Sequence, residues 1–235
     1  MPRIHRKLTR LARRSLDWSL DYQYVAWRQL VGFLRPTKLV KQGKGEREVS
    51  VLLIPGVYES WQFMRPIADV CTEAGYDVHV VDQLGYNRGS IEAMSEVVRR
   101  YITEQGLKRC VIVAHSKGGL IGKYLLAQQN EGGEIRGLIA INSPFAGSIY
   151  AYLMPVKSLR IFLPHSPLIA RLAANREVND RIISIYSSFD PHIPGGSYLE
   201  GAQNIELSIS GHFKPVNDKA VHQAVIEGIK KLSAN

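Results

Sequence analysis

The sequence predicts a single α/β domain, with a mostly parallel sheet of about six strands covered by helices on both faces, preceded by a basic helical arm. Three observations predict this class. Val- and Ile-rich apolar runs alternate along the chain with segments of helical periodicity. The 235 residues, 45% of them hydrophobic, suffice for one domain with a sizeable core. The surplus of basic residues is confined to the start of the chain, outside this alternation.

Residues 1–48 form the predicted arm and a short polar linker. They hold 12 Lys and Arg against 4 Asp and Glu, a net charge of +8, whereas the remaining chain is nearly neutral. Two interpretations of the amphipathic pattern stay open: peripheral contact of residues 1–35 with an anionic membrane, and packing of the helix on the domain or across a dimer. The apolar residues at helical spacing are Ile4, Leu8, Leu11, Trp18, Tyr22 and Val25.

The α/β domain is predicted over residues 49–235. Its apolar runs are nearly continuous, which is typical of parallel strands buried on both faces. The expected strands cover residues 49–55, 77–82, 110–115, 137–142, 181–186 and 205–210. The expected helices cover residues 61–74, 90–105, 117–129 and 216–233.

A long apolar connection interrupts the alternation after the fourth strand. Residues 143–180 contain several prolines and many large apolar side chains, and connections of this length are usually lids or binding elements. We expect a lid-like insertion that helps to form a substrate pocket, with ordinary core packing as the alternative for any single residue. The candidate pocket residues are Tyr58, from the turn after the first strand, and Phe145, Tyr150, Leu153, Met154, Phe162 and Leu163 from the insertion.

The segment "CVIVAHSKGGLIGKYLL", residues 110–126, passes from a predicted strand to a predicted helix through Ser116. Ala114 and Gly118 stand two residues before and after it, and no other serine has small residues at both positions. A sharp turn that lifts a hydroxyl above a sheet requires small residues at those places. The helix start also offers free N–H groups that favour negative charge. We therefore predict that Ser116 is a catalytic nucleophile.

A nucleophilic serine needs a general base and an acid that orients the base. Chemistry on an open parallel sheet gathers at the carboxyl ends of the strands. Asp190 follows the fifth predicted strand and His212 the sixth, so both lie at that edge, in the chain order Ser, acid, His. Asp82 also follows a strand but precedes the serine in the chain. We predict Asp190 as the acid and His212 as the base.

The oxyanion of an acyl-transfer reaction needs two backbone N–H donors. One is expected from the residue after the nucleophile, Lys117, and the other from the turn after the first strand, where Val57 is the best candidate. The alternative for this second segment is a plain turn made by Pro55 and Gly56.

The composition excludes several other classes of protein. Cys71 and Cys110 form no C-x-x-C or Cys–His pattern, so we expect two reduced thiols, no metal and no other cofactor. No apolar run reaches membrane-spanning length and no cleaved signal is recognisable, which predicts a cytoplasmic protein, with peripheral membrane contact of the arm as the open alternative. The domain has no basic surplus, so a nucleic-acid partner is not expected.

These motifs resemble those of the α/β-hydrolase superfamily, and within it the lipase- and esterase-like members. The likeness covers roughly residues 49–233. It includes "IPGVYESW" as the oxyanion segment, "AHSKGGL" as the elbow, "NSPFAGS", and "FDPHIP" and "SGHF" as acid and base segments. The resemblance implies the catalytic and oxyanion roles named above. The chain departs from the family at Lys117, where Met, Gln or Leu is more usual, and at Pro55, which replaces a His.

The resemblance implies a serine hydrolase that cleaves carboxylic esters through an acyl-enzyme. Its expected substrate is a small-molecule ester with an apolar acyl chain, as in lipid metabolism. Two alternatives stay open. A thioesterase or acyltransferase would use the same triad with another leaving group or acceptor, and a non-catalytic, membrane-associated binding protein would use only the hydrolase scaffold.

Overall fold

The computed structural model describes residues 15, 18–27, 48–153 and 156–234. The predicted polar linker, most of the predicted arm and the candidate pocket residue Met154 lie outside the described residues.

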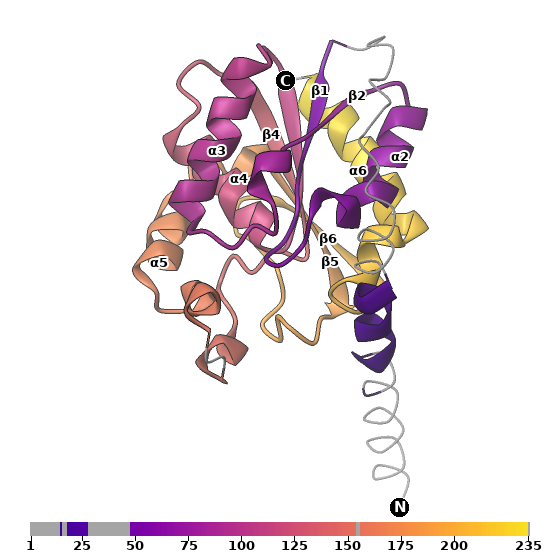
Figure 1. Ribbon diagram of the computed structural model, residues 1–235, viewed down its shortest axis with the longest axis vertical. Coiled ribbons are helices and arrows are strands. Elements are labelled where there is room, and N and C mark those ends of the chain that lie inside the picture. Colours follow the sequence, from indigo (N-terminus) through magenta and orange to yellow (C-terminus); the bar gives the residue numbers. More distant parts are fainter. Residues whose placement is uncertain (1–14, 16–17, 28–47, 154–155, 235) are drawn as a thin grey trace, which may run out of the picture.

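Six parallel strands form one sheet in the order β2-β1-β3-β4-β5-β6 (Figure 1). The central strands β3 and β4 are almost fully buried, which explains their continuous apolar sequences, whereas β6 lies at the edge and alternates in exposure. The strands are β1 (Ser50–Ile54), β2 (Asp77–Val80), β3 (Cys110–His115), β4 (Ile135–Ile141), β5 (Ile182–Phe189) and β6 (Gln203–Ser210).

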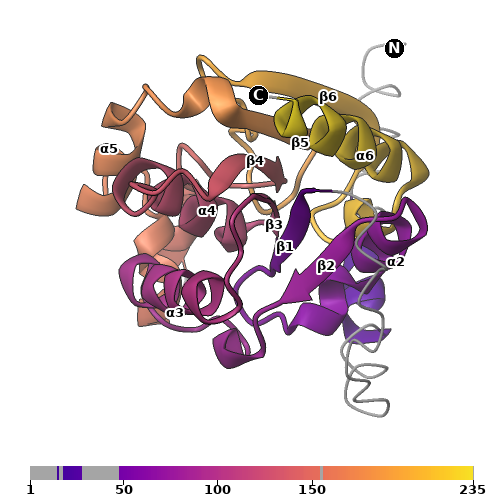
Figure 2. The same ribbon diagram turned by 90° about the horizontal axis from the view of Figure 1, so that it is seen from above.

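Helices cover both faces of the sheet, as Figure 2 shows from above. On one face lie α3 (Ile91–Glu104) and α4 (Lys117–Gln128), and on the other lie α2 (Arg65–Glu73) and α6 (Lys219–Ser233). Each face has its own hydrophobic core, because successive strand residues point to opposite sides of the sheet. The predicted fold class is confirmed.

The observed elements differ from the predicted ones mainly at helix starts. The helix predicted over residues 61–74 begins as a 3₁₀ turn, η1 (Trp61–Met64), and continues as α2, with Pro66 in its first turn. The final helix starts at Lys219, because Asp218 accepts a hydrogen bond from the backbone N–H of Ala220 and ends the preceding 3₁₀ turn, η6 (Lys214–Asn217).

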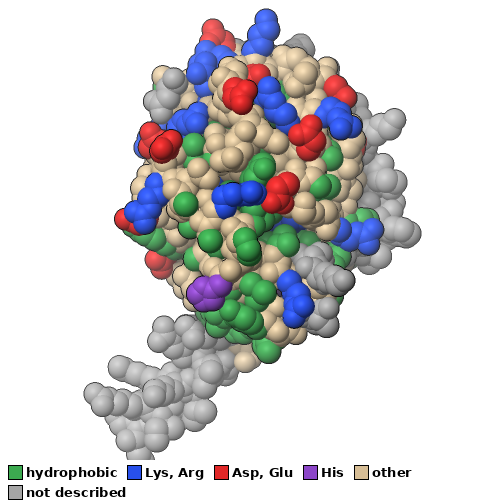
Figure 3. All heavy atoms as spheres, turned by 90° about the vertical axis from the view of Figure 1, so that its left-hand side faces the viewer, with side chains coloured by type: hydrophobic (Ala, Val, Ile, Leu, Met, Phe, Trp, Pro, Cys, Tyr) green, Lys and Arg blue, Asp and Glu red, His purple; other side chains and the backbone are tan. Residues whose placement is uncertain are grey.

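The connection between β4 and β5 forms short helical pieces beside α3 and α4: η3 (Ile149–Leu153), η4 (Lys157–Phe162), α5 (Pro167–Ala174) and η5 (Asn179–Arg181). Part of the connection, including Ile169 and Leu172 of α5, joins the core on that face of the sheet. Other apolar side chains of the connection, such as Tyr152, stay exposed. Figure 3 shows green hydrophobic side chains gathered at the lower end of the molecule, where Figure 1 places these pieces.

The described part of the arm, residues 18–27, is a helix that packs against the α/β domain. Tyr24 and Val25 lie against the core that α2 and α6 cover, and Asp21 is fully buried. Trp18 and Trp27 are exposed. Contact of the arm with a membrane stays a prediction. No helix among the described residues is both long and apolar enough to cross a bilayer.

Candidate active site

Ser116 occupies a strained turn between the carboxyl end of β3 and the start of α4. Its φ of 51° and ψ of −120° are rare for a residue with a side chain. Small neighbours make the turn feasible: a Cβ at Gly118 would overlap the backbone carbonyl oxygen of Ile54, and one at Gly119 would overlap the side chain of Ser143. The turn therefore depends on the glycines that follow the serine.

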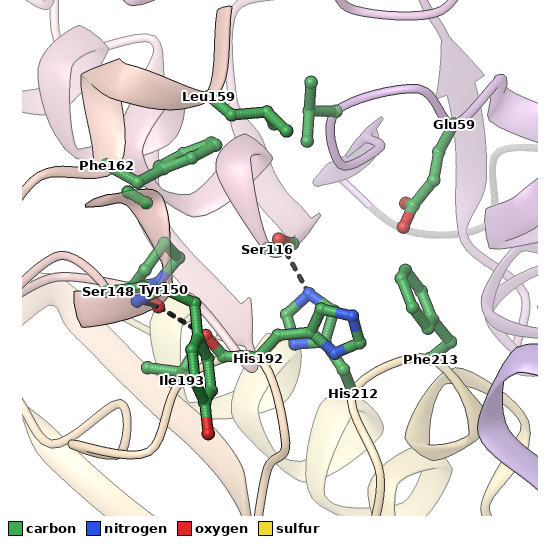
Figure 4. A pocket seen from close by; sticks show the side chains of 13 residues that line it. Glu59, Ser116, Ser148, Tyr150, Leu159, Phe162, His192, Ile193, His212 and Phe213 are labelled. Atoms are coloured by element: carbon green, nitrogen blue, oxygen red, sulfur yellow. Dashed lines mark hydrogen bonds between the residues drawn. The ribbon is translucent and has the colours of Figure 1, made fainter. Parts of the chain in front are cut away.

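Two hydrogen bonds join Ser116, His212 and Asp190 in one row (Figure 4 shows the first of them). The Oγ of Ser116 lies 2.9 Å from Nε2 of His212, and Nδ1 of the same ring lies 2.7 Å from Oδ2 of Asp190. All three side chains are buried. We call these residues the Ser116–His212–Asp190 row.

The Asp190 carboxylate is held on its other oxygen by the backbone. Its Oδ1 accepts hydrogen bonds from the N–H groups of His192, at 2.7 Å, and Ile193, at 3.0 Å. Burial acts to raise the pKa of Asp190, but the charge of His212, the hydrogen bond to its ring and the His192 N–H outweigh burial, so the pKa lies below its usual value. Asp190 is therefore an ionised carboxylate with a fixed orientation.

Burial acts to lower the pKa of His212, because a charged ring loses solvation. The charge and hydrogen bond of Asp190 oppose burial most strongly, and the carboxylates of Glu59 and Asp21 add to them. The pKa of His212 is therefore raised above its usual value. A ring of this kind is suited to accept a proton and to hold it for a time.

A second buried pair, Glu59 and His115, lies beside the row. Glu59 Oε2 accepts a hydrogen bond from the N–H of Gly56 at 2.7 Å and lies 2.9 Å from Nδ1 of His115. The other ring nitrogen of His115 lies 2.9 Å from the backbone carbonyl oxygen of His212. The pair thus links the turn after β1 to the loop after β6. Sequence reasoning missed it, since a lone Glu in a turn gives no signal.

The two predicted oxyanion residues flank the serine. Val57 lines the pocket together with Ser116, and Lys117 is the first residue of α4. Within the described part of the chain, the backbone N–H of neither residue donates a hydrogen bond to a protein acceptor. Both donors therefore stay available to a bound oxygen atom.

The side chain of Lys117 turns away from the serine into the protein. Its buried Nζ donates hydrogen bonds to the backbone carbonyl oxygens of Asn87, at 2.7 Å, and Gly89, at 2.5 Å. Burial lowers the pKa of this amine to about 8. The residue that departs from the family pattern thus ties the loop before α3 to the elbow.

An apolar pocket of about 130 Å³ opens beside Ser116 (Figure 4). Two of the predicted pocket residues, Tyr150 and Phe162, line it, so the insertion does contribute one wall. Its full lining is Val57, Glu59, Ser116, Pro144, Ser148, Tyr150, Ala151, Leu159, Phe162, His192, Ile193, His212 and Phe213.

Four other predicted pocket residues lie elsewhere. Phe145 is buried in the core beneath α3 and α4, and Leu163 packs against that core, because both side chains point into the domain. Leu153 is 76% exposed, since η3 turns it to solvent. Tyr58 does not line the pocket; the φ at this residue is 60°, and its N–H donates to the carbonyl oxygen of Tyr86.

Several pocket residues were not predicted, and His192 is the most notable. Its ring centroid lies 4.9 Å from that of His212, and its Nε2 lies 2.9 Å from the hydroxyl of Tyr22. Burial, helped by the charge of His212, lowers the pKa of His192 to about 4. His192, Ile193 and Phe213 lie within three residues after Asp190 or His212, and that proximity in the sequence is the signal that could have identified them.

Asp190, His192 and His212 are also the described residues placed closely enough to share a metal ion. Both oxygens of Asp190 already accept hydrogen bonds, and one of those bonds joins it to His212 Nδ1. A metal ion bound by these residues would have to break the bond between Asp190 and His212. The three side chains are therefore better suited to hydrogen bonding with one another than to binding a cation.

Comparisons with known proteins agree with the fold. A family model described as the alpha/beta hydrolase fold matches residues 49–163. A lipase from Bacillus licheniformis is similar with a TM-score of 0.61 at 13% identity, covering 81% of this chain and 95% of that one. A carboxylesterase structure from Nitrososphaera gargenis has a TM-score of 0.57 at 13% identity and coverages of 82% and 93%. A monoacylglycerol lipase from Paleococcus ferrophilus has a TM-score of 0.54 at 14% identity and coverages of 78% and 93%.

Identities this low show a shared fold and not a shared substrate. The family match nevertheless covers β1 to η4, which includes the elbow that carries Ser116. Beyond the matched residues, β5 and β6 extend the same parallel sheet, as expected for this fold. On these grounds the chain has the α/β-hydrolase fold.

Proposed function

We propose that the protein is a serine hydrolase that cleaves carboxylic esters, with the Ser116–His212–Asp190 row as its catalytic triad. The single observation that carries the proposal is the pair of hydrogen bonds, 2.9 Å and 2.7 Å long, that joins these three side chains beside an apolar pocket. Lipases and a carboxylesterase among the similar structures support the same class of reaction.

The first half of the reaction acylates the serine. His212 Nε2 accepts the proton of Ser116 while Oγ attacks the ester carbonyl carbon, and the Asp190 carboxylate stabilises the imidazolium that forms. The carbonyl electron pair moves to its oxygen, which accepts hydrogen bonds from the N–H groups of Val57 and Lys117. One such donor contributes about 2.7–4 kcal/mol to the transition state.

The second half releases the acid. His212 gives its proton to the leaving alcohol oxygen as the C–O bond breaks, which leaves the acyl group on Ser116. A water molecule then attacks the acyl carbon, His212 takes its proton, and the return of that proton to Oγ frees the carboxylic acid. Each proton transfer runs through the same ring nitrogen, so the ring must keep its Nδ1–H on Asp190 throughout.

The pocket favours an ester with an apolar acyl chain. The side chains of Leu159, Phe162 and Ile193 offer carbon contacts and no charge, so burial of an alkyl group there is favourable. Steady-state kinetics on p-nitrophenyl esters of rising chain length measure this preference. We expect kcat/KM to rise from acetate to a longer ester before the pocket is filled.

The test of the proposal compares the wild type with Ser116→Ala and His212→Ala on the best of these esters. Each variant should lose kcat by about 10⁶-fold while it keeps its fold, because either change removes nucleophilic catalysis. Variants that retain wild-type turnover would contradict the proposal. Product analysis with a competing alcohol or thiol distinguishes hydrolysis from acyl transfer, since both begin with the same acyl-enzyme.

A further inference from the structure

A buried carboxylate from the arm contacts the backbone of the loop that carries His212. Asp21 is 0% exposed although it lies in a surface helix. Its Oδ2 accepts a hydrogen bond from the N–H of His212 at 2.8 Å, and its Oδ1 accepts two more, from Phe213 at 3.0 Å and Lys214 at 2.9 Å. A charge buried this deeply is costly unless such donors surround it.

Asp21 binds the backbone N–H of His212, whereas Asn142 and His115 contact its backbone carbonyl oxygen. The carbonyl oxygen of His212 accepts a hydrogen bond from Nδ2 of Asn142 at 3.1 Å and lies 2.9 Å from Nε2 of His115. The ring itself is held by Asp190. The N–H that Asp21 binds is therefore the remaining main-chain group that fixes this residue in place.

The absence of a side chain at Gly211 makes room for the carboxylate of Asp21. Gly211, which precedes His212, has a φ of 115°, and a Cβ there would lie 2.6 Å from Oδ1 of Asp21. Tyr22, next to Asp21, reaches the other side of the site through its hydroxyl, 2.9 Å from Nε2 of His192. Two adjacent residues of the arm thus contact both loops that follow β5 and β6.

We propose that Asp21 is a positioning residue of the active site, whose carboxylate holds the His212 peptide so that Nε2 of the ring faces Ser116. The proposal rests on the proposed hydrolase function. It makes the arm, which precedes the α/β domain, part of the machinery for proton transfer. Misplacement of a catalytic group by about 1 Å can cost about 100-fold in rate, so loss of this hold should be visible in kcat.

The negative charge of Asp21 can be measured separately, through its effect on the pKa of His212. The titratable groups that face His212 are Asp190, Glu59 and Asp21, which raise its pKa, and the rings of His115 and His192, which lie beside it. Removing the charge of Asp21 should lower the pKa of His212. The acid limb of the kcat/KM profile should then move to lower pH, which reports the charge of Asp21 at His212, whereas the fall in kcat reports the loss of its hold on the peptide.

The experiment measures kcat, KM and the pH profile of p-nitrophenyl ester hydrolysis for wild type and Asp21→Asn. We expect kcat to fall by about 100-fold with little change in KM, and the acid limb to move to lower pH. The matched control is Asp218→Asn, which also removes a carboxylate that accepts a backbone N–H, at the start of α6. This control should lose some stability and keep the wild-type kcat and acid limb.

Wild-type kcat and acid limb in Asp21→Asn would overturn the proposal, and so would equal losses in Asp218→Asn. If Asp21→Asn does not fold, Asp21→Glu keeps the charge and moves it: a lowered kcat with the wild-type acid limb supports the proposal, and a wild-type kcat overturns it. A wild type that hydrolyses no ester would overturn the proposed function itself, whereas an active wild type with an equally active Asp21→Asn overturns only the role of Asp21.

Discussion

Replacing Asp190 by Asn tests the orientation of the proposed base with almost no change in shape. The structure fixes which way the new amide must face. Oδ1 of Asp190 accepts two backbone N–H bonds, from His192 and Ile193, so the amide oxygen has to stay there. The NH₂ group then takes the place of Oδ2 and points at Nδ1 of His212, 2.7 Å away.

An amide N–H in this position reverses the proton pattern of the ring. Nδ1 of His212 must become the acceptor, so Nε2 carries the hydrogen and can no longer take the proton of Ser116. Loss of the correct tautomer costs about 10⁴-fold in kcat, which corresponds to about 5.5 kcal/mol at 1.36 kcal/mol per factor of ten. The backbone bonds survive, so we expect little change in thermal stability.

The assay is steady-state hydrolysis of a p-nitrophenyl ester, with a thermal unfolding curve for each variant. Asp82→Asn is the control, since Asp82 also follows a strand and was the alternative acid in the sequence. A loss of less than about tenfold in folded Asp190→Asn, or an equal loss in Asp82→Asn, would refute the reasoning.

Three further outcomes are expected. Because the pKa of His212 is raised above its usual value of about 6.5, its protonation should shut down kcat/KM as pH falls, with a midpoint above 6.5; a flat profile between about pH 5 and 8 would contradict this. Gly118→Ala should cost about 1–3 kcal/mol of stability, measured by denaturant unfolding, because its Cβ would overlap the carbonyl oxygen of Ile54; unchanged stability would show that the turn can relax. Phe162→Leu should move the preferred acyl length upward in the ester series, and Leu153→Ala, at an exposed position, should not; equal shifts in both would argue against the described pocket wall.

The parts of the fold that follow from short-range pattern were predictable. All six strands fall within a few residues of their predicted positions, because buried parallel strands are continuous apolar runs separated by amphipathic helices. The same regularity brings Ser116, Asp190 and His212 to one edge of the sheet. A rule about strand ends and chain order therefore selected three residues that the structure joins by hydrogen bonds.

The side-chain details of the site depend on contacts that no local pattern encodes. Asp21 lies 191 residues before His212, and Glu59 lies 56 before His115, yet each pair is in direct contact. The pocket wall was harder to predict for another reason. Leu153 of η3 faces solvent whereas Phe162 of η4 lines the pocket, and 3₁₀ pieces this short show no helical period that would separate the two faces in the sequence.

The nucleophilic role of Ser116 is tested most directly by reaction with a fluorophosphonate, followed by mass spectrometry of the digested protein. We expect one adduct, on the peptide that contains Ser116, in the wild type and none in Ser116→Ala, and we expect its formation to be much slower in His212→Ala. An unlabelled wild type, or an adduct on another residue that persists in Ser116→Ala, would contradict that role.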